Sequence, residues 1–160
     1  MELLSSHLLS LILFFPVLAA VVVLCLPKEK LNAIRWTAFS ASLVPFGLTV
    51  FLWTQFKAGQ PGFQFEEQYT WYAALNSTFH LGVDGLSLTM VLLTTLLTPL
   101  ALLASFNITD RLKAYFMLFL FLEAGMLGVF MALDLLIFFV FWEIGLVPMY
   151  FLINQWGSEK

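Results

Sequence analysis

The amino-acid sequence predicts an all-α fold, a polytopic bundle of about five transmembrane helices in a single domain that spans residues 1–160. Of the 160 residues, 61% are hydrophobic and only 11% are charged, whereas soluble domains are about half apolar and about a quarter charged. The mean hydropathy of +0.95 points the same way. A net charge of −3 does not suit nucleic-acid binding, and the single cysteine excludes an internal disulfide.

Five stretches are long and apolar enough to cross a bilayer, which takes about 20 mostly apolar residues. They are 8–26, 36–56, 86–105, 114–133 and 135–156. Four of them contain a proline, which membrane helices tolerate because neighbouring helices satisfy the freed backbone groups. No basic residue precedes the first stretch and no small-residue cleavage site follows it, so we expect a retained helix there rather than a signal peptide.

The basic residues predict the orientation of the chain. All of them except Lys57 lie between the first two spans, between the third and fourth, or after the fifth. These regions share one side of the membrane, which the positive-inside rule places in the cytoplasm. We therefore expect the N-terminus and the one long loop, the outer loop 57–81, on the outside, and Lys160 in the cytoplasm. The predicted location is a bacterial inner membrane.

Glu143 is the first candidate for chemistry. It stands about 13 Å into the fifth span at a rise of 1.5 Å per residue, near the bilayer centre. An ionisable group there costs about 2.5–3.5 kcal/mol on insertion scales, so function is the default interpretation. We expect a proton-carrying carboxylic acid held inside the helix bundle. The alternative is a neutral acid that only hydrogen-bonds to a neighbouring helix.

Glu123 is the second candidate. It precedes the turn at Asp134 by eleven residues, and Glu143 follows that turn by nine. In an antiparallel hairpin their depths would differ by only about 3 Å, so the two carboxylates could titrate as a coupled pair. Depth does not set the angle about each helix, and the alternative is that the two side chains face different directions.

Three more residues flank these spans. Pro148 has no N–H, so it leaves the carbonyl of Ile144 without its helical partner, which predicts either a helix break beside Glu143 or an ordinary kink. Asp84 is placed to cap the third span at its outer end, and His80 is an imidazole that can titrate near neutral pH. For this outer-loop pair a structural role is the favoured interpretation.

Two runs of the sequence resemble a known family. They are "HLGVDGLSLTMVLLTTLLTPLALLASF" and "GMLGVFMALDLLIFFVFWEIGLVPMYFLINQWG". Both are similar to the antiporter-like subunit M (chain 4) of bacterial NADH:quinone oxidoreductase, or complex I, and the resemblance runs from about residue 80 to the end. It implies the N-terminal part of an antiporter-like fold, in a family whose inverted repeats form half-channels for protons.

The resemblance also implies roles for the candidate residues. Glu143 matches the family's fifth-helix glutamate, which pairs with a lysine on a later helix to control protonation of a half-channel. Glu123 lies in a fourth-helix segment, "LEAGMLGVF", that resembles some members. His80 and Asp84 match the outer-loop motif, for which a structural role is expected.

The implied function is proton translocation coupled to quinone reduction, as a membrane-arm subunit of complex I. The resemblance implies other membrane-arm subunits, including antiporter-like neighbours, and the lipid bilayer as partners. The sequence carries no nucleotide-binding glycine motif and no haem or iron–sulfur ligand set. NADH, FMN, iron–sulfur clusters and quinone are therefore expected elsewhere in the complex. The alternatives are the equivalent subunit of a multisubunit cation/proton antiporter or membrane-bound hydrogenase, and a structural membrane subunit that does not pump.

Overall fold

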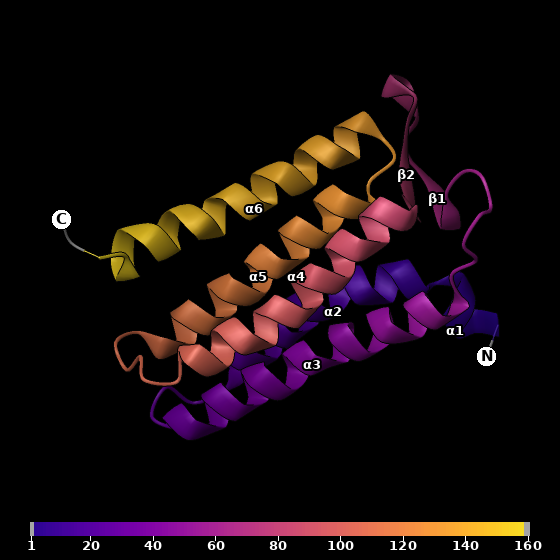
Figure 1. The fold of residues 1–160 in the computed structure, drawn as a ribbon. Helices are drawn as coiled ribbons and strands as arrows, with labels where there is room; N and C mark the ends of the chain where they lie inside the picture. Colours follow the sequence, from indigo (N-terminus) through magenta and orange to yellow (C-terminus); the bar gives the residue numbers. More distant parts are fainter. Residues whose placement is uncertain (1, 159–160) are drawn as a thin grey trace.

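Five long helices and a β-hairpin make up the computed structural model, which describes residues 2–158 (Figure 1). The helices run parallel or antiparallel to one another, and the hairpin stands at one end of the bundle. In chain order, the elements are α1 (Glu2–Ser6), α2 (Leu8–Cys25), α3 (Leu31–Gln55), β1 (Gln64–Tyr72), the short 3₁₀ turn η1 (Ala73–Leu75), β2 (Ser77–Val83), α4 (Gly85–Ala104), α5 (Leu112–Met131) and α6 (Leu135–Trp156).

All five predicted spans are present as helices long and apolar enough to cross a membrane. Four of them agree with the prediction to within two residues at each end. The exception is α3, which begins at Leu31 rather than at residue 36 and so includes Arg35. The Arg35 guanidinium donates to the Asn32 side chain at 3.2 Å and to the Ile108 carbonyl at 3.1 Å, whereas its buried Nε has no hydrogen-bond partner among residues 2–158.

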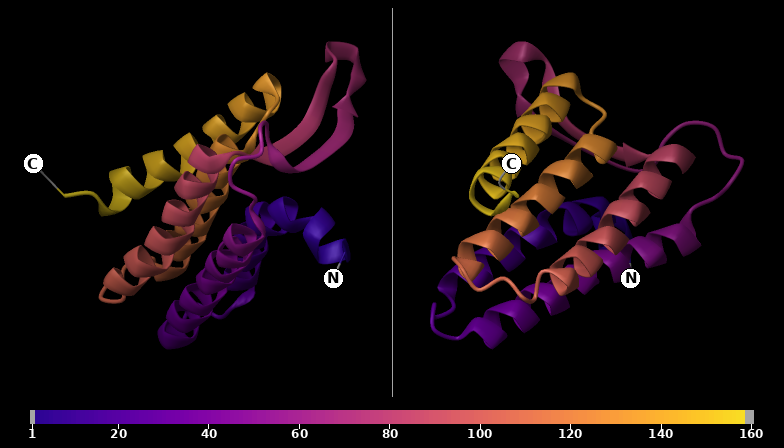
Figure 2. Two further views of the ribbon diagram at one scale, coloured as in Figure 1. Left: turned by 45° about the vertical axis from the view of Figure 1, so that its right-hand side comes forward. Right: turned by 60° about the vertical axis from the view of Figure 1, so that its left-hand side comes forward.

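The packing places α5 at the centre and α6 at the edge. Helix α5 packs against α2, α4 and α6, and α3 completes the group by packing against α2 and α4. Helix α6 packs mainly on α5 and touches β2 (Figure 2). Only three of its residues are buried, Ile137, Phe141 and Pro148. The four-helix group α2–α5 therefore forms the core, and α6 contributes one face to it.

The prediction of a loop over 57–81 was wrong, because most of this segment forms an antiparallel hairpin with residues up to Val83. Strand β1 pairs with β2, with Gln68 opposite His80 and Thr70 opposite Thr78. The pairing shifts register twice, between Gln64 and Glu67 and again between Thr70 and Tyr72. Such bulges change which face the side chains point to, so the strand shows no clean alternation in the sequence.

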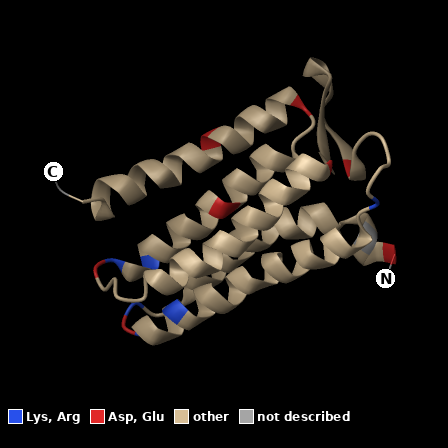
Figure 3. Ribbon diagram, viewed as in Figure 1, with Lys and Arg blue, Asp and Glu red and all other residues tan. Residues whose placement is uncertain are grey.

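Charged residues gather at the two ends of the bundle (Figure 3). The basic loops 26–30 and 105–111 lie at the end opposite the hairpin, as the predicted topology requires. The exceptions are the two acidic positions in the middle of α5 and α6, Glu123 and Glu143.

Candidate proton-transfer site

Glu123 is a fully buried carboxylate in the core of the bundle. Its helix places it on the same face as Phe116, Leu120 and Leu127, all of which are 0% exposed, as is Glu123 itself. Phe116 and Leu120 belong to an apolar cluster toward the basic end, and Leu127 belongs to a second cluster toward the hairpin. Glu123 therefore interrupts the apolar face of α5 near the middle of the membrane span.

Neither side-chain oxygen of Glu123 has a hydrogen-bond partner among residues 2–158. The nearest basic residue on its own helix is Lys113, ten positions and so about 15 Å away along the axis. An ionised carboxylate in an apolar interior is very costly unless it is paired or hydrated. A change in the protonation state of Glu123 must therefore bring a movement of water or of a polar group with it.

The same interior contains buried hydroxyl groups on α3 and α4. Thr95 and Thr98 lie in the middle of α4, at 0% and 1% exposure, and Ser42 and Thr49 lie on α3 at 1% and 0%. Each donates its hydroxyl to a carbonyl of its own helix, as Thr98 does to Thr94 at 2.9 Å. A hydroxyl that donates in this way keeps lone pairs that can accept, so the core holds acceptors as well as apolar surface.

Glu143 is not buried by residues 2–158, contrary to the expectation from the sequence. Its side chain is exposed along the middle of α6. It borders an apolar groove of about 660 Å³ between α2, α5 and α6, whose walls include Phe14, Phe121 and Pro148. Of the two mid-span glutamates, Glu123 is enclosed by protein and Glu143 lies at the surface of the bundle.

The two glutamates do not face each other. Helices α5 and α6 touch where a Cβ on Gly125 would lie 2.6 Å from the backbone nitrogen of Gly145, and where one on Gly128 would meet the ring of Phe141. Glu123 is two residues from Gly125, and Glu143 is two residues from Gly145. Two residues turn a helix by about 200°, so each glutamate points away from the α5–α6 contact.

Their depths also differ more than expected. Because Gly125 and Gly145 lie at one level, Glu123 lies about 3 Å to one side of that level and Glu143 about 3 Å to the other. The separation along the axis is thus about 6 Å rather than about 3 Å. Of the two alternatives that the sequence left open, a coupled pair or side chains that face different directions, this arrangement corresponds to the second.

Pro148 does not break α6, which continues unbroken from Leu135 to Trp156. The proline is buried and still leaves the carbonyl of Ile144 without its helical N–H. Both residues line the same groove as Glu143. Helix α6 therefore leaves the backbone carbonyl of Ile144 free, one residue after Glu143, without a break in the helix.

The outer-loop residues hold the hairpin end together. Asp84 caps α4 as predicted, accepting from the backbone N–H of Ser87 at 2.8 Å, and this bond lowers the pKa of its carboxyl. His80 lies in β2, where its carbonyl accepts from the N–H of Leu133 at 2.8 Å. Its Nε2 is 3.7 Å from a carboxylate oxygen of Glu66. Neither residue reaches Glu123 or Glu143 from this position outside the spans.

Asp134 also links structural elements at the hairpin end of the bundle, a role that the sequence did not predict. It caps α6 through the N–H groups of Leu136 and Ile137, and it accepts from the Ser77 hydroxyl at 2.8 Å and from the Thr78 N–H at 3.3 Å. Partial burial raises the pKa of Asp134, but these hydrogen bonds outweigh it and the pKa is lowered. The aspartate therefore ties the α5–α6 turn to the hairpin.

A second buried carboxylate, Glu67, was also missed. It accepts from the Ser10 hydroxyl at 2.6 Å and from the Ser10 N–H at 3.0 Å. His7 lies 3.6 Å from it and contacts the Tyr69 hydroxyl at 3.0 Å. The signal in the sequence was Ser10, the one hydroxyl in an apolar first span.

No protein-family model matches the sequence, but individual relatives do. The chain is 41% identical over 147 residues to "NAD(P)H-quinone oxidoreductase chain 4 1" of a Picosynechococcus species, which covers 91% of this chain and 28% of the relative. It is 41% identical over 160 residues to "NADH-quinone oxidoreductase subunit M" of Rhodobacter capsulatus, covering 97% and 31%. It is 37% identical over 153 residues to "NADH-ubiquinone oxidoreductase chain 4" of Marchantia polymorpha, covering 95% and 31%.

Solved structures give the same assignment of the fold. A chain of respiratory complex I from Thermus thermophilus superimposes with a TM-score of 0.77 at 27% identity, over 94% of this chain and 30% of the other. A chain of the archaeal membrane-bound sulfane sulfur reductase superimposes at 0.70 with 18% identity, which shows a shared fold alone. The chain spans about three tenths of the length of the relatives above, with which it is homologous along nearly all of its own length.

Proposed function

We propose that this chain, a homologue of subunit M (chain 4) of NADH:quinone oxidoreductase, forms part of the proton-translocating membrane arm of such a complex. Identity of 41% to subunit M over 97% of the chain supports the assignment, together with the structural match to complex I. The charge distribution supports an orientation with the N-terminus outside and the basic loops in the cytoplasm, in a bacterial inner membrane.

The observation that carries the proposal is the unpartnered carboxylate of Glu123 in the core of four membrane-spanning helices. Ionisable groups inside membrane proteins are rare and mark proton relays in pumps. Glu123 would take up and release a proton inside the bundle, with the buried hydroxyls of α3 and α4 and incoming water as partners. Glu143 would act as a second carrier, at the groove between α2, α5 and α6.

In this proposal the two carboxylates act as separate proton carriers. Because each side chain points away from the close contact of Gly125 with Gly145, we expect no direct proton transfer between the two carboxylates. Glu143 exchanges protons with groups outside α5, where the unpaired Ile144 carbonyl is available to a water molecule. The redox chemistry, with NADH, FMN, iron–sulfur clusters and quinone, belongs to other subunits of the complex in this proposal.

Single substitutions in the assembled complex test the proposal. Glu123→Gln and Glu143→Gln keep the shape of the side chain and remove the titratable proton. Each should lower proton uptake into reconstituted vesicles at least tenfold while the complex still assembles. Glu29→Gln is the matched control, because Glu29 lies in the loop between α2 and α3, outside the spans. If both Glu123→Gln and Glu143→Gln pump as well as the control, the chain has only a structural role.

A separate experiment tests which electron donor the complex uses. The same fold occurs in a sulfane sulfur reductase complex, so the fold does not distinguish complex I from an antiporter or hydrogenase relative. Affinity purification of the tagged chain from native membranes should bring down subunits that bind nicotinamide and flavin. Recovery of only cation-transporting or hydrogenase partners would contradict the complex I assignment.

A further inference from the structure

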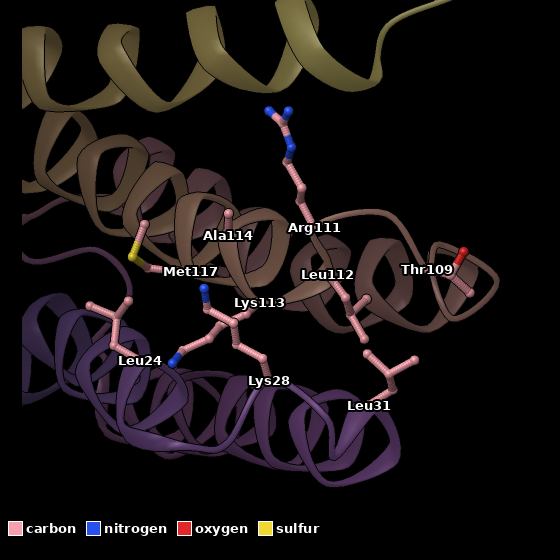
Figure 4. A pocket seen from close by; sticks show the side chains of 9 residues that line it. All are labelled: Leu24, Lys28, Leu31, Thr109, Arg111, Leu112, Lys113, Ala114 and Met117. Atoms are coloured by element: carbon pink, nitrogen blue, oxygen red, sulfur yellow. The ribbon is translucent and has the colours of Figure 1, made fainter.

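A cavity opens at the basic end of the bundle, away from the glutamates. Its volume is about 600 Å³, and it lies between the end of α2, the loop that follows, and the start of α5 (Figure 4). Leu24, Leu31, Leu112 and Met117 give it apolar walls. The end of a transmembrane bundle is the level at which lipid headgroups meet the acyl chains, so these walls face the outer part of the hydrocarbon layer.

Two lysines enter this cavity from opposite sides. Lys28 reaches across from the loop after α2, and Lys113 reaches back from the first turn of α5, so that both ammonium groups end in the same space (Figure 4). Within residues 2–158, neither ammonium group lies within 4.0 Å of a carboxylate. Two like charges that share a cavity repel each other, and an anion placed between them removes that repulsion.

Arg111 also borders the cavity but turns away from it. Its guanidinium points toward α6 and donates to the Gln155 side chain at 3.0 Å (Figure 4). Its backbone adopts the left-handed conformation and begins α5 without a side-chain cap. The first N–H groups of the helix, at Leu112, Lys113 and Ala114, therefore have no intrahelical acceptor. These N–H groups, together with the positive end of the helix dipole, favour an anion at the side of the cavity that α5 forms.

We propose that this cavity binds the headgroup phosphate of an anionic phospholipid. Lys28, Lys113 and the first N–H groups of α5 bind the phosphate, and the acyl chains follow Leu24 and Met117 along the apolar sides of α2 and α5. Basic pockets between transmembrane helices bind phospholipid headgroups in this way. A soluble anion would not use the apolar walls, and Leu24, which lies on a candidate membrane-spanning helix, is 46% exposed. The proposal is independent of proton transfer.

Native mass spectrometry of the intact, detergent-purified complex tests it. Dioleoyl-phosphatidylglycerol and dioleoyl-phosphatidylcholine are titrated separately, because they share acyl chains and differ in headgroup charge. The wild type should retain phosphatidylglycerol with at least tenfold preference. Each lysine contributes about fivefold to affinity and the pair about 30-fold, so Lys28→Gln/Lys113→Gln should lose the preference, and Lys28→Arg/Lys113→Arg should keep it.

The control removes the same charge elsewhere. Lys30 lies in the same loop but outside this cavity, and Lys57 lies at the hairpin end of the bundle. Lys30→Gln/Lys57→Gln should bind phosphatidylglycerol as the wild type does. If both double variants lost phosphatidylglycerol binding equally, the binding would reflect a general attraction of the lipid to the basic surface, and the proposed site would be wrong. Equal retention of the two lipids by the wild type, or displacement of the lipid by millimolar inorganic phosphate, would also overturn the site.

Discussion

A methyl group at Gly125 should force α5 and α6 apart. A Cβ built there lies 2.6 Å from the backbone nitrogen of Gly145, 2.7 Å from its Cα and 3.2 Å from the carbonyl carbon of Ile144. All three are backbone atoms, so no side chain can rotate out of the way. Carbon contacts are favourable at about 3.5–4.0 Å, and α6 must therefore move by about 1 Å. Overpacking of this kind costs about 1–3 kcal/mol.

Gly145→Ala provides the matched control at the same contact. A Cβ on Gly145 lies 3.8 Å and 3.9 Å from the nearest atoms of Gly125, which is an ordinary contact distance. Alanine also favours a helix over glycine by about 1 kcal/mol. This variant should therefore be as stable as the wild type or more stable, although it introduces the same methyl group between the same two helices.

The assay is thermal unfolding of the protein in detergent, followed by intrinsic tryptophan fluorescence. Each kcal/mol should shift Tm by about 2–4 °C for a chain of this size. Gly125→Ala should lower Tm by several degrees, and Gly145→Ala should leave it unchanged or raise it. Equal effects of the two variants, or greater damage from Gly145→Ala, would refute the helix contact and with it the angular positions of Glu123 and Glu143.

Three further predictions follow from the buried and capping carboxylates. Asp134→Ala should cost about 2 kcal/mol at pH 7. Because the pKa of Asp134 is lowered in the folded protein, the difference from the wild type should shrink as the pH falls below about 4, measured by pH-dependent Tm. Ser10→Ala removes a hydrogen-bond donor from the buried Glu67 carboxylate and should lower the free energy of unfolding by about 1–3 kcal/mol. Backbone amides of β1 should then exchange hydrogen faster, and unchanged exchange would contradict this prediction. Glu123→Leu should leave Tm unchanged or raise it while it abolishes pumping, because an unpartnered polar group is replaced by an apolar one. A loss of more than about 2 kcal/mol would mean that Glu123 has a partner.

The positions of the helices along the chain could be predicted because each depends on a local property. A run of about 20 apolar residues must be a helix in the membrane, where its backbone has no other partner. The start of α3 was missed because Arg35 was taken to lie outside the span, whereas its side chain reaches the Ile108 carbonyl of another loop. A charged residue can enter a helix end when a distant segment accepts its hydrogen bonds, and only the folded arrangement shows that.

The hairpin and the directions of the glutamates could not be predicted for a different reason. Strand β1 contains two bulges, so its side chains do not alternate by sequence position. The direction of Glu123 depends on which residues of α5 meet α6, and that contact is set by Gly125 and Gly128 together. Both glycines can be read from the sequence, but their positions alone do not show which helix they contact.

Because Glu123 is buried and Glu143 is exposed among residues 2–158, substitutions at the two glutamates test different surroundings. Glu123 is fully buried among residues 2–158, and neither of its oxygens has a hydrogen-bond partner there, so its protonation depends on water or polar groups that move into the core. Glu143 lies on a helix with three buried residues and an exposed outer face that includes Val147 and Tyr150. Its surroundings are therefore set by lipid or by protein beyond residues 2–158. A substitution at Glu123 tests the core of this bundle, whereas a substitution at Glu143 tests its contact with whatever covers α6, and the two losses of pumping need not share a pH dependence.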